Sequence, residues 1–116
     1  MSAVKKFYSI LKHELEDVEE DILALMAVYE HRREAGEITE YVYKSNAATF
    51  RREMSSIAEI VRELADDSTH APGDLGAAET HLMEMIRKSV KDYDFPKAVL
   101  DLCQRKIQKV RRFVEV

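Results

Sequence analysis

The first part of the chain carries an apolar stripe with heptad spacing. The stripe consists of Val4, Tyr8, Leu11, Leu15, Val18, Ile22, Leu25 and Tyr29. These positions are separated alternately by four and three residues, and an average spacing of about 3.5 keeps one side of a helix facing its partner along the whole length. We therefore predict a long helix over residues 3–33, with Ser2 as its N-cap.

A second heptad stripe follows a short turn. It consists of Tyr43, Ala47, Phe50, Met54, Ile57, Val61 and Leu64. Gly36 suits the left-handed conformation that ends many helices, and Thr39 can accept hydrogen bonds as the N-cap of a helix over residues 39–65. Two long helices joined by a tight turn predict an antiparallel helical hairpin.

The rest of the chain predicts two shorter helices. Residues 66–76 gather a proline and two glycines among small polar residues, which is typical of a loop. We predict helices over residues 77–91 and 96–114, the second beginning at a proline that suits the first turn. Their inward positions are Leu82, Ile86 and Val90, then Val99, Leu102, Cys103, Ile107, Val110 and Phe113. The whole chain, residues 1–116, is therefore predicted to be one all-α domain, an up-and-down four-helix bundle dominated by the hairpin.

The predicted helices differ in length, and this affects how they can cover one another. The two shorter helices cannot each cover the full length of the hairpin. Either they lie end to end along it, or another chain covers the remainder. Because contiguous exposed apolar stripes are uncommon on soluble monomers, we expect a homodimer.

Composition excludes several classes of protein. The chain has 116 residues, of which 46% are hydrophobic and 34% charged, with three glycines, two prolines and a single cysteine. Collagen-like, low-complexity and disulfide-framework chains are therefore excluded. Since no apolar run approaches the roughly 18 residues that span a bilayer, we expect no membrane contact. A lone cysteine suits a reducing compartment, so we expect a cytoplasmic protein.

Charge is distributed unevenly along the chain. The net charge is −4, which gives no general attraction for nucleic acid, yet residues 96–116 carry six basic and two acidic side chains. An acidic block lies in the first helix, at Glu14, Glu16, Asp17, Glu19, Glu20 and Asp21. The block and the basic helix could meet within the chain or across a dimer, or could remain solvated or face another protein. Our candidate partner-binding residues are Arg105, Lys109, Arg112, Glu16 and Glu20.

The histidines suggest a metal site only by their spacing. A histidine precedes a glutamate by three residues in three pairs, His13 and Glu16, His31 and Glu34, His81 and Glu84. The heptad register places His13 and His31 opposite the apolar stripe, and no Glu-x-x-His motif of a di-iron bundle occurs. We therefore expect surface histidines, with no metal and no cofactor. Cys103, among inward positions of its helix, is expected to be a small buried hydrophobic residue.

These patterns favour a binding role over a catalytic one. Every core position that they assign is apolar or small, whereas catalysis needs convergent polar groups. We therefore expect a non-enzymatic interaction or assembly protein, such as an adaptor, a small chaperone or a regulatory subunit, that presents charged helix surfaces to a protein partner. The alternative is a signalling bundle. Lys12-His13-Glu14-Leu15 resembles the phospho-accepting box of sensor histidine kinases, which implies phosphotransfer through His13.

Overall fold

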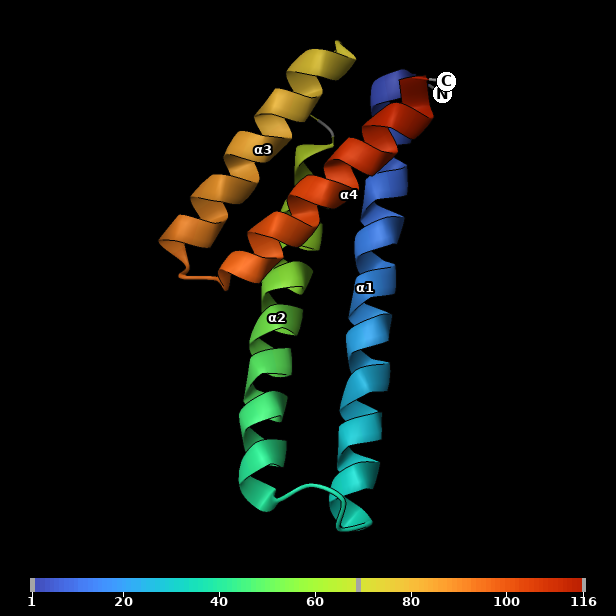
Figure 1. The fold of residues 1–116 in the computed structure, drawn as a ribbon. Helices are drawn as coiled ribbons and strands as arrows, with labels where there is room; N and C mark the ends of the chain where they lie inside the picture. The colour runs from blue at the N-terminus through green and yellow to red at the C-terminus, as the bar shows by residue number, and fades with distance from the viewer. Residues whose placement is uncertain (1, 69, 116) are drawn as a thin grey trace.

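The chain folds into four helices. The computed structural model describes residues 2–68 and 70–115, and these contain α1 (Ala3–Glu34), α2 (Glu40–Asp67), α3 (Leu75–Asp92) and α4 (Lys97–Glu115). Successive helices alternate in direction, and the described residues form no strand (Figure 1). The predicted all-α four-helix bundle is confirmed.

The predicted helix caps are present. The Ser2 hydroxyl accepts a hydrogen bond from the Lys5 amide at 3.2 Å, and the Thr39 hydroxyl accepts one from the Val42 amide at 3.1 Å. Each cap satisfies one amide that has no carbonyl partner within its own helix. Gly36 has φ +74°, so the turn between α1 and α2 uses a left-handed backbone that glycine adopts without strain.

The loop between α2 and α3 is shorter than the predicted 66–76. Helix α2 continues to Asp67, and α3 begins at Leu75 because Asp74 acts as its N-cap, accepting a hydrogen bond from the Ala77 amide at 2.9 Å. The sequence pattern placed the loop boundary too late because it took Gly76 for a loop residue, whereas Gly76 lies in the first turn of α3. Thr69, inside the predicted loop, lies outside the described residues.

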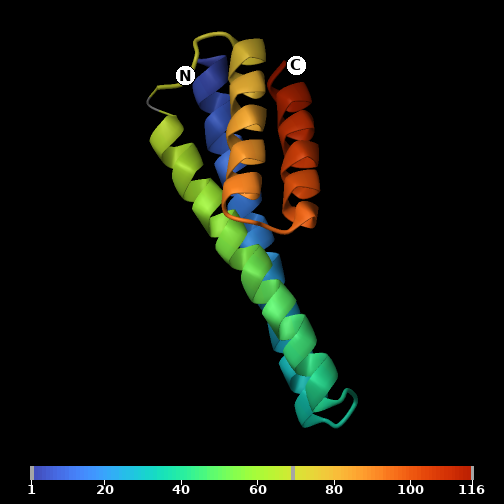
Figure 2. The same cartoon turned by 90° about the vertical axis from the view of Figure 1, so that its left-hand side faces the viewer.

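Helices α3 and α4 lie side by side over one half of the α1/α2 pair (Figures 1 and 2). At about 1.5 Å per residue, α1 is about 48 Å long and α4 about 28 Å. The end-to-end arrangement that the lengths allowed is therefore wrong. We call the covered part of the pair, residues 3–22 and 53–67, the proximal half. Residues 23–52, which extend beyond α3 and α4, are the distal half.

The core lies in the proximal half, between all four helices. Its fully buried large side chains include Leu11, Leu15, Ile57, Ile60, Leu64, Leu82, Ile86 and Ile107. Phe7, which the stripe did not assign, is also fully buried. Cys103 is buried as predicted, and burial raises the pKa of its thiol to about 12.

Phe113 is the clearest error in the predicted core. Its side chain is 61% exposed, and its ring lies 5.6 Å from the Lys6 ammonium. Val110 and the half-buried Val114 take the inward positions of the last turns of α4, so Phe113 falls to one side of the stripe.

Candidate interaction surfaces

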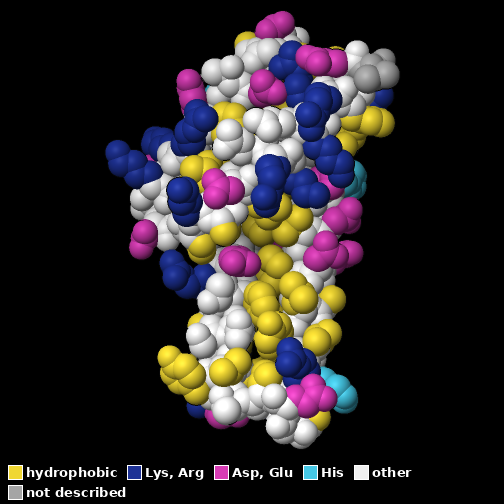
Figure 3. Space-filling view, viewed as in Figure 1, with side chains coloured by type: hydrophobic (Ala, Val, Ile, Leu, Met, Phe, Trp, Pro, Cys, Tyr) yellow, Lys and Arg dark blue, Asp and Glu magenta, His cyan; other side chains and the backbone are white. Residues whose placement is uncertain are grey.

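The distal half exposes large apolar side chains. Among residues 23–52, all of which the structure describes, Ala47 is the one buried residue, whereas Leu23, Leu25, Val28, Tyr41 and Val42 are all exposed. Figure 3 shows hydrophobic side chains continuing in a column along the distal half, below the region that α4 covers. The apolar stripes of α1 and α2 therefore run beyond the helices that could bury them.

Some of these exposed side chains form one surface. It lies on the side of the α1/α2 pair that α4 covers in the proximal half. Val18 lies in a hollow beside the first turn of α4, and Leu25 is seven residues further along α1, on the same side of the helix. We define the distal apolar surface as Leu25, Val28 and Val42, which are exposed, together with the half-buried Tyr29 and Phe50. It is a continuation of the proximal core that this chain leaves uncovered.

Contacts near the turn keep the two distal helices together without help from α3 or α4. The rings of Tyr29 and Phe50 lie 5.4 Å apart, centroid to centroid. The Arg33 guanidinium stacks 4.0 Å from the centroid of the Tyr43 ring and lies 3.7 Å from the Glu40 carboxylate. These contacts join α1 to α2, so they hold the two helices of the distal half together.

The basic helix α4 meets one member of the acidic block. The ammonium groups of Lys106 and Lys109 donate to the Glu14 carboxylate at 3.1 and 2.8 Å. These hydrogen bonds, that of Lys109 foremost, lower the pKa of Glu14. The charge complementarity between the block and α4 thus occurs within the chain, but through Glu14, which was not among the candidate partner-binding residues.

The structure spreads the candidate partner-binding residues over several surfaces. Glu20 and Arg112 are exposed, and Arg105 lies beside the hollow that contains Val18. Lys109 is the one of these candidates that binds the acidic block, and Glu16 lies 3.5 Å from the imidazole of His13. The imidazole of His13 is itself 75% exposed. The candidates therefore do not converge on one site.

A polar network that the sequence patterns did not assign joins α1, α2 and α3. The Tyr8 hydroxyl donates to Asp67 Oδ2 at 2.7 Å, and His81 Nε2 lies 2.8 Å from Asp67 Oδ1. Burial alone raises the pKa of Asp67, but the hydrogen bonds from His81 and Tyr8 outweigh it, so this pKa lies below its usual value. Burial, with the hydrogen bond to Asp67, raises the pKa of Tyr8.

His81 was expected to be a surface histidine, and its side chain is 43% exposed. Its imidazole is bonded to Asp67, because the last turn of α2 packs against α3 at this point. One signal for this network was present in the sequence. Tyr8 belongs to the buried stripe, and a buried tyrosine hydroxyl requires a hydrogen-bond partner.

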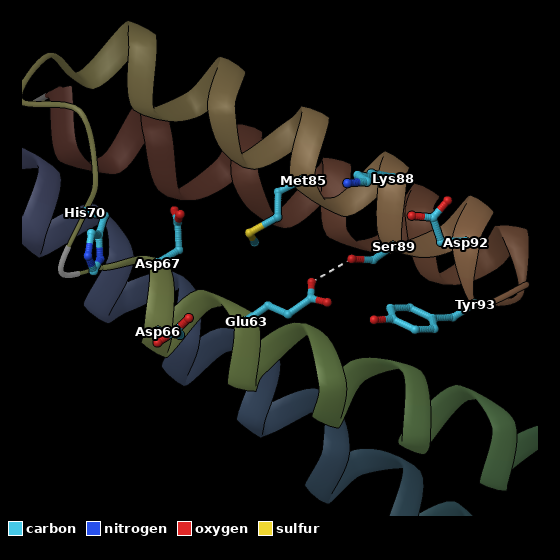
Figure 4. A pocket seen from close by; sticks show the side chains of 9 residues that line it. All are labelled: Glu63, Asp66, Asp67, His70, Met85, Lys88, Ser89, Asp92 and Tyr93. Carbon is cyan, nitrogen blue, oxygen red and sulfur yellow. Dashed lines mark hydrogen bonds between the residues drawn. The ribbon is translucent and has the colours of Figure 1, made fainter.

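An open groove of about 530 Å³ separates α2 from α3 near this network (Figure 4). Four carboxylates and one lysine are among its lining residues, Glu63, Asp66, Asp67, His70, Met85, Lys88, Ser89, Asp92 and Tyr93. The Ser89 hydroxyl donates to Glu63 Oε2 at 2.6 Å, which ties the two helices together across the groove. The groove is acidic in character, so it disfavours anionic ligands.

The described residues contain no group of three or more histidine, cysteine or acidic side chains placed to hold a metal ion. Within the same part of the chain, no helix is long and apolar enough to cross a membrane. Comparison with protein-family models, with curated proteins and with solved structures finds no match to this chain.

Proposed function

We propose that this protein is a non-enzymatic interaction or assembly protein that binds a protein partner through the distal apolar surface. The observation that carries the proposal is the exposure of Leu25 and Val28, which are 46% and 52% exposed, whereas Leu11 and Leu15 earlier in the same helix are fully buried. Contiguous exposed apolar surface is typical of protein-binding sites. The charged candidates on α4 become secondary, because Lys109 already binds Glu14 within the chain.

The core supports a binding role over catalysis. Among the described residues, the buried polar side chains are Ser56 and Ser89, and each hydroxyl is engaged in a hydrogen bond. Catalysis needs acids, bases or donors that converge on a pocket shielded from water. The lone cysteine, buried in the core, suits a reducing compartment, so we propose that binding takes place in the cytoplasm.

Site-specific photo-crosslinking in the cells that make the protein tests this proposal. A photoreactive amino acid would replace Val28 on the distal apolar surface, Arg112 on the basic helix or, as a control, the exposed Lys91 on α3. We expect covalent adducts from position 28 and none from position 91. Adducts from position 112 alone would move the binding site to α4, and the absence of adducts from every position would contradict the proposal.

Phosphotransfer through His13 is the second candidate function. It is favoured by one observation, the 75% exposure of the His13 imidazole on the outer side of a helix. Neighbouring carboxylates, including Glu16 at 3.5 Å, repel an incoming phosphate. The test is acid-labile labelling by a small phosphodonor such as acetyl phosphate. Labelling of the wild type and of His31→Ala, but not of His13→Ala, would support phosphotransfer, whereas an unlabelled wild type would eliminate it.

A further inference from the structure

The side of α1 that α4 covers in the proximal half carries a short stripe in the distal half, with opposite charges at its two ends. Asp21, Leu25, Val28 and Arg32 are separated by four, three and four residues, so they share one side of the helix. All four are exposed. Within the described residues Asp21 makes no ion pair, while Arg32 lies 3.3 Å from the exposed carboxylate of Glu37. Along the helix, the residues of the stripe are therefore acidic, apolar, apolar and then basic.

We propose that a second copy of this chain covers the distal apolar surface, with the two copies antiparallel and related by a two-fold axis. This inference rests on the proposed function and names its partner. Reversing the stripe places Asp21 of each copy opposite Arg32 of the other, and Leu25 opposite Val28. The two ion pairs and the apolar centre form together only in this orientation, since a parallel arrangement would place like charges opposite each other.

The area left uncovered agrees with this assignment. The chain exposes 7278 Å² of surface, whereas a compact monomer of 13.4 kDa exposes about 6,500 Å². The excess is about 800 Å², which is also about the area that each partner buries in a stable protein interface. Packing against a second distal half would thus reduce the exposed area of each copy to about that of a compact protein.

The shape of the molecule also fits a copy of itself. At about 1.5 Å per residue, the distal part of α1, residues 23–34, is about 18 Å long. The loop between α3 and α4 forms a step at its base (Figures 1 and 2). Two such molecules packed antiparallel would each place a distal half in the recess of the other. The four distal helices would then form a bundle like that of the proximal half, with the exposed Tyr93 at the step beside the tip of the opposite copy.

Two leucines on α1 provide a matched pair of variants. Leu25 belongs to the stripe, whereas Leu23, 53% exposed, points to the opposite side of the helix. Sedimentation equilibrium should show a wild-type dimer, and Leu25→Glu should raise its dissociation constant on the order of 100-fold, since the two-fold axis repeats the change. Leu23→Glu should leave it within a factor of about three. Circular dichroism would establish that both variants keep the helical content of the wild type.

Charge reversal tests the antiparallel pairing itself. Asp21→Arg places two arginines opposite each other at both ends of the interface, and Arg32→Asp places two acids there, so each variant alone should be a weaker dimer than the wild type. Mixed together, the two variants should form a heterodimer as stable as the wild-type dimer, because each arginine again faces an acid. Altered stability of either monomer cannot produce this rescue.

Each result decides between the second copy and another partner. A wild-type chain that stays monomeric up to about 1 mM, or equal weakening by Leu23→Glu and Leu25→Glu, would overturn the homodimer. Failure of the mixed variants to associate would overturn the antiparallel orientation. If the chain is monomeric and position 28 crosslinks to a different protein in cells, the homodimer fails while the proposed function stands. If position 28 forms no adduct at all, both fail.

Discussion

The proximal and distal halves of the α1/α2 pair share one heptad pattern but have opposite surroundings. In the proximal half, α3 and α4 complete a four-helix core in which Leu11 and Leu15 are fully buried. In the distal half, the same stripe continues through Leu25, which is 46% exposed. The heptad pattern thus specifies which side of each helix is apolar, whereas the lengths of α3 and α4 determine how much of that side is buried.

The comparison also shows how the molecule departs from a compact monomer. Its principal extents are 53 × 29 × 19 Å, and its radius of gyration is 16.3 Å, against about 13 Å for a compact chain of this length. The distal half accounts for the elongation. Aromatic and charged contacts near the turn hold it together, whereas close apolar packing holds the proximal half.

The largest expected effect comes from truncating a buried leucine in the proximal half, compared with an exposed leucine in the distal half. Leu15→Ala should lower the free energy of unfolding by about 3 kcal/mol, because it opens a cavity among fully buried side chains. Leu25→Ala should lower it by less than about 1 kcal/mol when measured on the monomer, because that side chain is already half in water. Urea denaturation at low protein concentration measures both. Equal losses would mean that the distal half has a core of its own.

An intermediate effect concerns the polar network at the end of the proximal half. Asp67→Asn should lower the free energy of unfolding at pH 7 by about 1–2 kcal/mol, because it removes a carboxylate that accepts hydrogen bonds from Tyr8 and His81. The exposed Asp17→Asn is the control, with an expected change below about 0.5 kcal/mol.

The effect of Asp67 should depend on pH in a defined direction. Its pKa is lower in the folded protein than the value of about 4 expected in the unfolded chain. The stabilisation is therefore complete above about pH 4 and is lost as the pH falls through the lowered pKa. Unfolding curves of wild type and Asp67→Asn should converge at acid pH. A difference that stays constant across this range would contradict the role of the carboxylate.

The smallest expected effect belongs to the ion pairs between α1 and α4. Lys109→Ala should lower the free energy of unfolding by less than about 1 kcal/mol, because its ammonium is 62% exposed and Lys106 still binds Glu14. The loss should shrink further in 1 M salt, which screens exposed charges. A loss as large as that of Leu15→Ala would show that charge, and not apolar packing, holds the proximal half together.

Much of the fold follows from local rules that the sequence displays directly. Heptad spacing gave the positions of α1 and α2, and Ser2, Gly36 and Thr39 marked their ends because caps and left-handed turns depend on few neighbouring residues. Phe113 was assigned wrongly because its inward or outward position depends on how α4 is rotated against α1. Periodicity alone does not determine that rotation.

The candidate sites were less predictable, because they depend on contacts between residues far apart in the chain. Tyr8 and Asp67 are 59 residues apart, and the bond between them requires the packing of α1 on α2. The distal apolar surface could be predicted in part, since unequal helix lengths implied an uncovered stripe. The position of the uncovered stripe could not be predicted, because it depends on α3 and α4 packing side by side.

The buried cysteine gives the chain an internal reporter of its own opening. Cys103 is the single thiol of the chain, and it lies in the proximal core with a pKa raised to about 12. A thiol reagent can therefore label the native protein only when the packing around Cys103 opens, because burial and protonation both protect the sulfur. The labelling rate thus measures how often the proximal bundle opens, independently of fluctuations at the distant tip of the α1/α2 pair.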